Sequence, residues 1–314
     1  MAHLKQCDVR SWRAVQLTLK GHLETPFPAL VAKPAADVDK KELVTVIRRP
    51  LQDGKMTTAR KLRAYLHAAY SCAVRADSDP SLPSSFTAFN VTRNPVETVA
   101  PIKGRADKRP LPVADLRRYW NQLKERDGPA GAALRLHVLS GGQRPQQLAR
   151  ITENDIKDGV LRLMDGKGRR TAARAHLLPI TDAMQSELAT LLEVVKEVDR
   201  RQEASNEKPT AGFLLSTDGG KTSMHSSSLS NWASEIGADA GIADFQLKRV
   251  RSGIETLLAA ARIPKHVRGQ LQSHGIGGVQ DTHYDDHDYI EEKREALAEL
   301  QRLLESPSLV TANA

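Results

Sequence analysis

Apolar residues recur at helical spacing along most of the chain, and this period is the main structural signal in the sequence. Side chains three or four positions apart lie on one face of an α-helix, so a repeated apolar stripe predicts an amphipathic helix. In the first hundred residues the pattern predicts helices over 11–23, 39–54 and 57–76. After residue 112 it predicts helices over 113–126, 130–142, 184–201, 229–241, 245–261, 264–274 and 289–304.

The pattern changes between Asp155 and Thr181. Two short segments, 158–164 and 175–181, are strand-like and flank the polar turn DGKGRRTAARA. Two such segments joined by a turn indicate neighbouring antiparallel strands. The sequence therefore predicts a mainly α-helical protein with one small antiparallel β-sheet.

A basic segment with four prolines, residues 94–112, divides the chain. Proline favours extended connections, and a chain of 314 residues is long enough for two domains. We expect a helical domain over 1–93, a linker over 94–112, a mixed α+β domain over 113–305 and a tail over 306–314.

The charge is positive overall and unevenly distributed. The chain carries 46 basic and 38 acidic residues, a formal net charge of +8, which favours a polyanionic partner. Residues 1–110 hold 19 Lys and Arg against 10 Asp and Glu, whereas 281–305 is acidic. Arg60, Lys61 and Arg63 cluster in the third predicted helix, where they form either a solvated face or a DNA-contacting one.

Several protein classes do not fit the composition. No apolar run approaches the roughly 20 residues of a membrane span, and the first residues lack the apolar core of a signal peptide. Cys7 and Cys72 are the only cysteines, too few for a disulfide framework or a cysteine metal site. We expect a globular protein of the cytoplasm, with no membrane partner.

Candidate chemistry begins at Arg144, which directly precedes Pro145. A residue before proline avoids the helical conformation, so Arg144 should project from the turn. Its guanidinium could bind a phosphate through two parallel hydrogen bonds. Taken alone, this pattern also fits an ordinary capping arginine.

Further polar residues follow in a compact series. Lys248 and Arg251 are three positions apart and share a helix face, and His274 ends the next predicted helix. Tyr284 lies ten residues beyond His274, after a pair of glycines.

These residues resemble the signature of the tyrosine recombinases, the phage integrase family. That signature is an Arg in a "TGxR" turn, a Lys on a hairpin, an HxxR pair, a "GH" box and a Tyr about ten residues later. The resemblance covers residues 111–305 and, more weakly, the helical N-terminal domain. It implies an N-terminal core-binding domain, a catalytic domain over 113–305 and a double-stranded DNA substrate.

The resemblance also implies a role for each matched position. Arg144 and Arg251 would bind the phosphate, and Lys167 would protonate the departing 5′ oxygen. His274 would match the histidine of the "GH" box, and Tyr284 the nucleophile that forms a 3′-phosphotyrosine. Lys248 stands where the family has the histidine of HxxR, so an acid or base role there is in question. Ser273 replaces the glycine of "GH".

The implied reaction needs neither ATP nor metal, because the phosphotyrosine bond keeps the energy of the cut strand. Consistent with this, the sequence has no GxxxxGK[ST] loop and no HExxH motif, and we expect no cofactor. The family works as a tetramer on paired DNA sites to integrate or excise mobile elements, sometimes with a DNA-bending or directionality protein. The resemblance further implies that the C-terminal helix packs on a neighbouring protomer, through Ile290, Ala296, Leu297, Leu300 and Leu304.

Other interpretations stay open at this stage. A type IB topoisomerase shares the chemistry, and a DNA-binding protein without catalysis would fit Lys248. Tyr289 is the rival nucleophile, His176 reads as structural rather than catalytic, and Arg169, Arg170 and Arg174 as contacts to the DNA backbone. We find no room for a separate arm-binding domain before the helical one, so either the chain works without arm sites or it begins at an introduced Met1.

Overall fold

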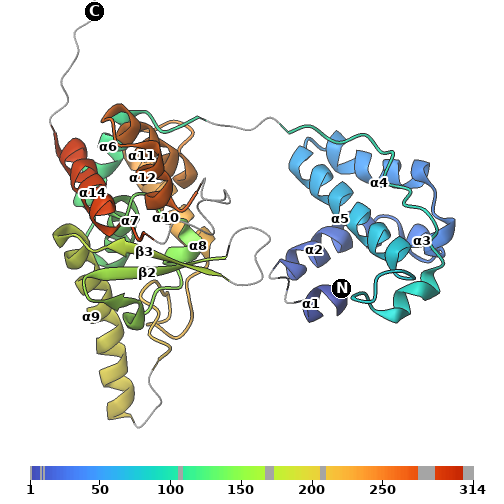
Figure 1. Cartoon of the computed structure of the whole chain (residues 1–314), viewed down its shortest axis with the longest axis horizontal. Helices are drawn as coiled ribbons and strands as arrows, with labels where there is room; N and C mark the ends of the chain where they lie inside the picture. The colour runs from blue at the N-terminus through green and yellow to red at the C-terminus, as the bar shows by residue number, and fades with distance from the viewer. Residues whose placement is uncertain are drawn as a thin grey trace, which may run out of the picture. The chain divides into compact units, whose positions relative to one another are not determined.

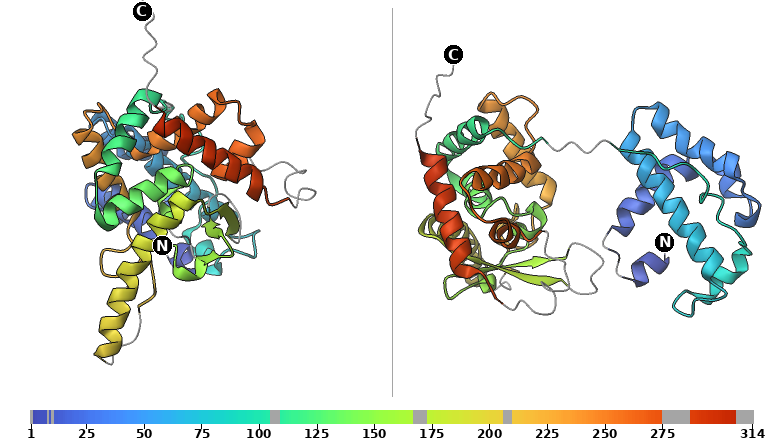
Figure 2. Two further views of the ribbon diagram at one scale, coloured as in Figure 1. Left: turned by 90° about the vertical axis from the view of Figure 1, so that its left-hand side faces the viewer. Right: turned by 45° about the horizontal axis from the view of Figure 1, so that its top comes forward.

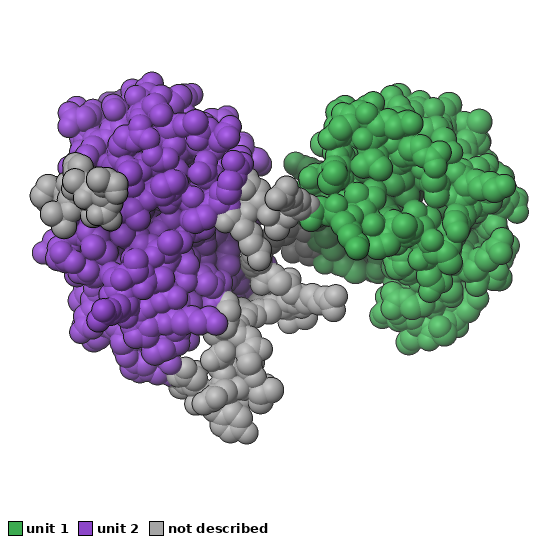
Figure 3. Space-filling model, turned by 90° about the horizontal axis from the view of Figure 1, so that it is seen from above, with its two compact units in different colours: residues 1–107 green, residues 108–314 purple. Residues whose placement is uncertain are grey.

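The computed structural model describes residues 2–7, 9, 11–104, 109–166, 173–205, 210–274 and 287–306. The chain forms two compact units, residues 1–107 and 108–314, called unit 1 and unit 2 below (Figure 3). In the described residues no helix is long and apolar enough to cross a membrane.

Unit 1 is all-helical (Figure 1). Its two longest helices, α4 (Lys40–Gln52) and α5 (Met56–Arg75), pack together around Leu43, Val46, Ile47 and Leu62. Asp39 caps α4: its side chain accepts from the Glu42 amide at 2.9 Å, and the Glu42 side chain accepts from the Asp39 amide at 2.8 Å. The other elements are α1 (Ala2–Gln6), α2 (Trp12–Leu19), the π-helix η1 (Lys20–Glu24), α3 (Pro28–Val31), and the 3₁₀ turns η2 (Ala35–Asp37) and η3 (Ser84–Phe89).

Residues at both ends of the predicted linker, 94–112, belong to the cores of the two units. Val96 and Val99 are buried in the core of unit 1, and the Asn94 side chain donates to the backbone oxygen of His67 at 3.0 Å. At the other end Leu111 is buried in the core of unit 2. Proline and charge marked the whole segment as a connection, but its valines and leucine have enough apolar surface to join the two cores.

Unit 2 combines helices with the predicted small sheet. The sheet has the order β1 (Ile156–Lys157), β2 (Val160–Asp165), β3 (Arg174–Pro179), and all neighbours are antiparallel. In β2 Leu161 and Leu163 face the core, while Arg162 and Met164 are exposed. The helices are α6 (Val113–Lys124), α7 (Gly128–Leu139), α8 (Pro145–Leu148), α9 (Asp182–Ala204), α10 (Ser226–Asp239), α11 (Leu247–Ala260), α12 (Lys265–Gln272) and α14 (Ile290–Glu305), with a 3₁₀ turn η4 (Glu153–Asp155).

The C-terminal helix α14 packs on its own unit, which corrects the expectation that it packs on a neighbouring protomer. It lies against β3, α12 and α11 (Figure 2). Leu297 and Leu300 are buried in the core of unit 2, and so are Ala296 and Leu304. Lys293 is buried as well, and its Nζ donates to the backbone oxygens of Leu177 at 2.9 Å and Asp288 at 2.7 Å. Helical periodicity identifies the apolar face of α14, but it does not show which surface that face covers.

Replacing Leu300 by Ala should lower the free energy of unfolding of unit 2 by about 2–5 kcal/mol, because a fully buried leucine leaves a cavity. Urea unfolding of the full chain measures this, with Glu295→Ala at an exposed position of α14 as the control. The loss should be independent of protein concentration. A loss that grows on dilution would place α14 on a neighbouring protomer instead.

Candidate active site

Arg144 lies in the turn that joins α7 to α8. Gly141 and Gly142 end α7 with φ angles of 84° and 72°, a region that glycine enters without strain. A Cβ on Gly142 would lie 2.9 Å from the Arg251 Cα, so this turn and α11 can approach only through glycine. Arg144 itself is extended (φ −64°, ψ 130°), as its position before Pro145 predicts.

The Arg144 guanidinium is held on one side by two oxygens. Its Nη1 donates to the Asp165 Oδ2 at 3.2 Å, and its Nη2 donates to the backbone oxygen of Ser273 at 3.0 Å. The side chain keeps 21% of its surface exposed. Arg144 is therefore partly buried and fixed, yet accessible to a ligand.

Arg251, on α11, reaches the same region. Its Nη1 donates to the backbone oxygen of Gly142 at 2.9 Å, and its Nη2 donates to that of Gln272. Burial and the nearby charge of Arg144 lower its pKa to about 10. Arg251 thus stays charged at neutral pH.

Two buried glutamines fasten the segments that carry these arginines. The Gln272 Nε2 donates to the backbone oxygens of Gly141 at 2.9 Å and Arg251 at 3.0 Å. The Gln143 Nε2 donates to those of Ser140 at 2.7 Å and Leu271 at 2.9 Å. The end of α7, α11 and the end of α12 are therefore joined by side-chain bonds as well as by packing.

His274 follows α12 and completes the described part of the site. Its Nε2 lies 3.7 Å from the Glu255 Oε2, and the other Glu255 oxygen accepts from the Arg268 Nε at 2.9 Å. Burial lowers the pKa of His274; Glu255 acts in the opposite direction, and Arg251 and Arg144 lower it further. At neutral pH the imidazole is therefore neutral.

The structure thus brings together three of the six predicted site residues, Arg144, Arg251 and His274. Lys248 is exposed one turn before Arg251 on α11, and within the described residues it has no hydrogen-bond or ion-pair partner. Lys167 and Tyr284 lie outside the described residues, so their roles stay predictions. The rival Tyr289 sits at the start of α14, with its ring centroid 4.6 Å from that of His287.

Two further residues of the hairpin face this site. His176 on β3 is buried, its ring Nε2 lies 3.1 Å from the backbone oxygen of Leu271, and burial lowers its pKa to about 3. A buried histidine that stays neutral fits a structural role for His176 rather than a catalytic one. Arg174 Nη2 donates to the Ser273 Oγ at 3.1 Å, so within unit 2 this arginine contacts the site itself; Arg169 and Arg170 lie outside the described residues.

Sequence reasoning missed Asp165 and Glu255. Asp165 continues the inward-facing series Leu161, Leu163 of β2, so a carboxylate at the third inward position was a readable signal. Glu255 lies four positions after Arg251 and faces the same side of α11. The glutamines gave no comparable signal, because their partners are backbone atoms of distant segments.

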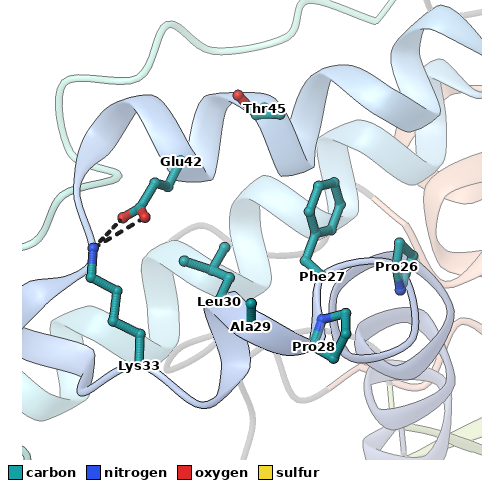
Figure 4. Close-up of a pocket in the computed structure, with 8 residues that line it drawn as sticks. All are labelled: Pro26, Phe27, Pro28, Ala29, Leu30, Lys33, Glu42 and Thr45. Atoms are coloured by element: carbon teal, nitrogen blue, oxygen red, sulfur yellow. Dashed lines mark hydrogen bonds and ion pairs between the residues drawn. The ribbon is translucent and has the colours of Figure 1, made fainter.

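Unit 1 contains a separate cavity of about 470 Å³ (Figure 4). Phe27 and Leu30 line it, and the ion pair between Lys33 and Glu42, 3.1 Å long, stands at one end. All described residues of the candidate active site belong to unit 2.

Solved structures share this architecture. A lambda integrase dimer bound to a COC′ core site matches with a TM-score of 0.58 and 16% identity, over 90% of this chain and 91% of that chain. A lambda integrase tetramer bound to a Holliday junction matches with a TM-score of 0.58 and 17% identity, over 88% and 74%. XerH site-specific recombinase bound to its difH substrate matches with a TM-score of 0.53 and 15% identity, over 77% and 65%.

No family model and no curated protein sequence matches the chain, so the likeness is one of fold. Lambda integrase and XerH recombinase have the same fold, in agreement with the family that the residues from Arg144 to Tyr284 resemble. The expected fold class, mainly helical with a small antiparallel sheet, is confirmed.

Replacing His176 by Gln should make the stability of unit 2 less dependent on pH. The folded pKa of about 3 lies below the ordinary 6.5, so the stability that comes from burying the neutral ring is complete above pH 6.5 and is lost as pH falls from 6.5 towards 3. The free energy of unfolding should fall by at most about 1.4 kcal/mol for each pH unit. Urea unfolding between about pH 4.5 and 7.5 measures it. Equal slopes for wild type and His176→Gln would contradict the assignment.

Proposed function

We propose that this chain is a site-specific DNA recombinase or integrase that cuts and rejoins double-stranded DNA through a covalent bond to Tyr284. The fold is shared with recombinases solved on DNA, and the site adds two fixed arginines and a neutral histidine. Integration or excision of a mobile element is the biological role that fits such an enzyme.

The arrangement of Arg144 and Arg251 is the observation that carries this proposal. Each guanidinium has five N–H donors and uses two of them on oxygens of the described residues, which leaves three for a ligand. Their charges lie close together, so that Arg144 adds to the effect of burial in lowering the pKa of Arg251. Two cations fixed in this way suit the non-bridging oxygens of a phosphodiester, whose negative charge must be stabilised during transfer.

In the proposed reaction the Tyr284 phenol oxygen attacks phosphorus. A bond forms between that oxygen and phosphorus, and the bond from phosphorus to the 5′ oxygen breaks. The neutral His274 can accept the phenol proton, and Lys167 supplies a proton to the departing 5′ oxygen. Attack by a 5′ hydroxyl on the phosphotyrosine reverses these steps, so rejoining consumes no ATP and uses no metal ion.

The proposed enzyme acts as a tetramer on paired DNA sites, as lambda integrase does in its tetramer on a Holliday junction. Because the apolar face of α14 packs on its own unit, the proposed contacts between protomers do not need that face. The proposed setting is the bacterial cytoplasm or nucleoid, where a DNA-bending or directionality protein could assist.

Replacing Tyr284 by Phe should abolish covalent capture of DNA, because only the phenol oxygen can form the ester. A library of nicked duplexes with a randomised core serves as the substrate, since a strand released at the nick cannot rejoin. Wild type should form an adduct resistant to denaturing electrophoresis, and Tyr284→Phe should not. An adduct that survives in Tyr284→Phe but is lost in Tyr289→Phe would transfer the role to Tyr289.

DNA affinity should fall steeply with salt, because phosphate contacts release counterions with a slope of about 0.9 per contact on logarithmic axes. Arg60 and Lys61 are exposed on α5, whereas Arg63 donates to the backbone oxygen of Val99 at 2.6 and 3.0 Å. Replacing both Arg60 and Lys61 by Ala should reduce the slope by up to about 2. Arg63→Ala is the matched control and should leave the slope unchanged. A DNA affinity that does not change with salt would contradict contacts between unit 1 and DNA phosphates.

A further inference from the structure

Asp165 is a buried carboxylate that no motif in the sequence accounts for. It ends β2 and is 5% exposed, at an inward position of the strand where Leu161 and Leu163 precede it. A carboxylate removed from water is strongly unfavourable unless it is paired and hydrogen-bonded. Its partners therefore indicate why the fold keeps it.

Two of its partners are parts of the candidate active site. The Asp165 Oδ2 accepts from the Arg144 Nη1 at 3.2 Å and from the Ser273 Oγ at 2.6 Å. The backbone oxygen of Ser273 accepts from the other Arg144 nitrogen, Nη2, at 3.0 Å. Arg144, Asp165 and Ser273 thus form a closed triangle, in which each residue bonds to the other two.

Ser273 takes an unusual backbone conformation to complete this triangle. Its φ of 48° and ψ of 53° are left-handed, which is unfavourable for a residue with a Cβ. The hydroxyl offsets this strain, because it donates to Asp165 and accepts from the Arg174 Nη2 at 3.1 Å. A glycine would fit the backbone more easily but would leave Asp165 without this donor.

We propose that Asp165 is a positioning residue for Arg144. The carboxylate, itself held by Ser273, fixes one edge of the guanidinium, so that the remaining N–H groups meet the phosphate in one orientation. This inference rests on the function proposed above. The proposed role also explains why the fold keeps a negative charge near the site where DNA phosphate would bind. The Asp165 carboxylate contacts Arg144 from the interior of the unit and is almost fully shielded from solvent.

Asp165→Asn tests the inference, because it keeps the size of the side chain and removes its charge. The control is Glu187→Gln, which removes the charge from another partly buried pair of unit 2, in which the Arg135 Nε donates to Glu187 at 2.7 Å. Duplex affinity and the rate of adduct formation in the first turnover are measured separately, on a nicked duplex selected from the randomised library. Asp165→Asn should slow adduct formation by about 10- to 100-fold and change the duplex Kd by less than about 3-fold.

A merely structural role is separated by repeating the substitution in an Arg144→Lys background. If Asp165 acts through Arg144, Asp165→Asn should slow that background by less than about 3-fold, because coupled residues are not additive. Glu187→Gln should have the same small effect in both backgrounds. The inference is overturned if Asp165→Asn slows both backgrounds equally, or if Glu187→Gln slows adduct formation in the wild-type background as much as Asp165→Asn does.

A spectroscopic measurement keeps the inference testable if wild type forms no adduct, a result that would count against the proposed function alone. In nitrogen-15 spectra of the arginine side chains, restrained guanidinium groups show separate Nη signals and freely rotating ones show a single average. The Arg144 Nη signals should be separate in wild type and in Glu187→Gln, and should exchange faster in Asp165→Asn, because the guanidinium then keeps only the Ser273 oxygen and an uncharged amide. Averaged Arg144 signals in wild type, or an unchanged rate of exchange in Asp165→Asn, would show that Asp165 does not hold this side chain.

Discussion

The backbone oxygens at the end of α12 hold two guanidinium groups, and the rest of the site depends on this contact. Arg251 donates to the oxygen of Gln272, and Arg144 to that of Ser273, the next residue. The C-terminus of a helix carries partial negative charge, so it suits cations. Burial lowers the pKa of Arg251 most, and the charge of Arg144 lowers it further. Without these acceptors, that repulsion would favour separating the two arginines. Asp165 and Glu255 add full negative charges to the same region.

Close approach between α7, α11 and α12 is the structural condition for that contact. Gly142 allows α11 to pass within van der Waals distance of the turn, and Gln272 joins the three segments through its amide. Side chains placed by several rigid elements can be held in one geometry more closely than side chains on a single loop. The site is thus a product of how helices pack, and its arginines come from segments more than a hundred residues apart in the sequence.

Periodicity and turn chemistry predict much of this fold from the sequence alone. The helices of unit 2, the β2–β3 hairpin and the extended Arg144 follow from local rules, because each depends on neighbours in sequence. The buried face of α5 did not follow: Ala59, Leu62 and Leu66 are buried, whereas Ala69, at helical spacing from Leu62 and Leu66, is exposed. Tertiary packing decides between adjacent stripes when a helix offers more than one.

The remaining misses share a physical cause. Which core Val96, Val99 and Leu111 join, and which surface α14 covers, depend on contacts between distant segments. The same holds for Asp165, whose partners Arg144 and Ser273 are 21 and 108 residues away in sequence. Residue type showed that Arg144, Arg251 and His274 suit phosphate chemistry, but the groups that hold them became visible only in the folded chain.

The central claim is that Tyr284 becomes covalently attached to DNA next to this pair of arginines. The most direct measurement is to trap the protein on nicked DNA, digest both components, and locate the residue that retains a nucleotide by mass spectrometry. The account predicts a nucleotide linked through its 3′ phosphate to Tyr284. A nucleotide on Tyr289 or on any other side chain, or a 5′ linkage, would contradict it.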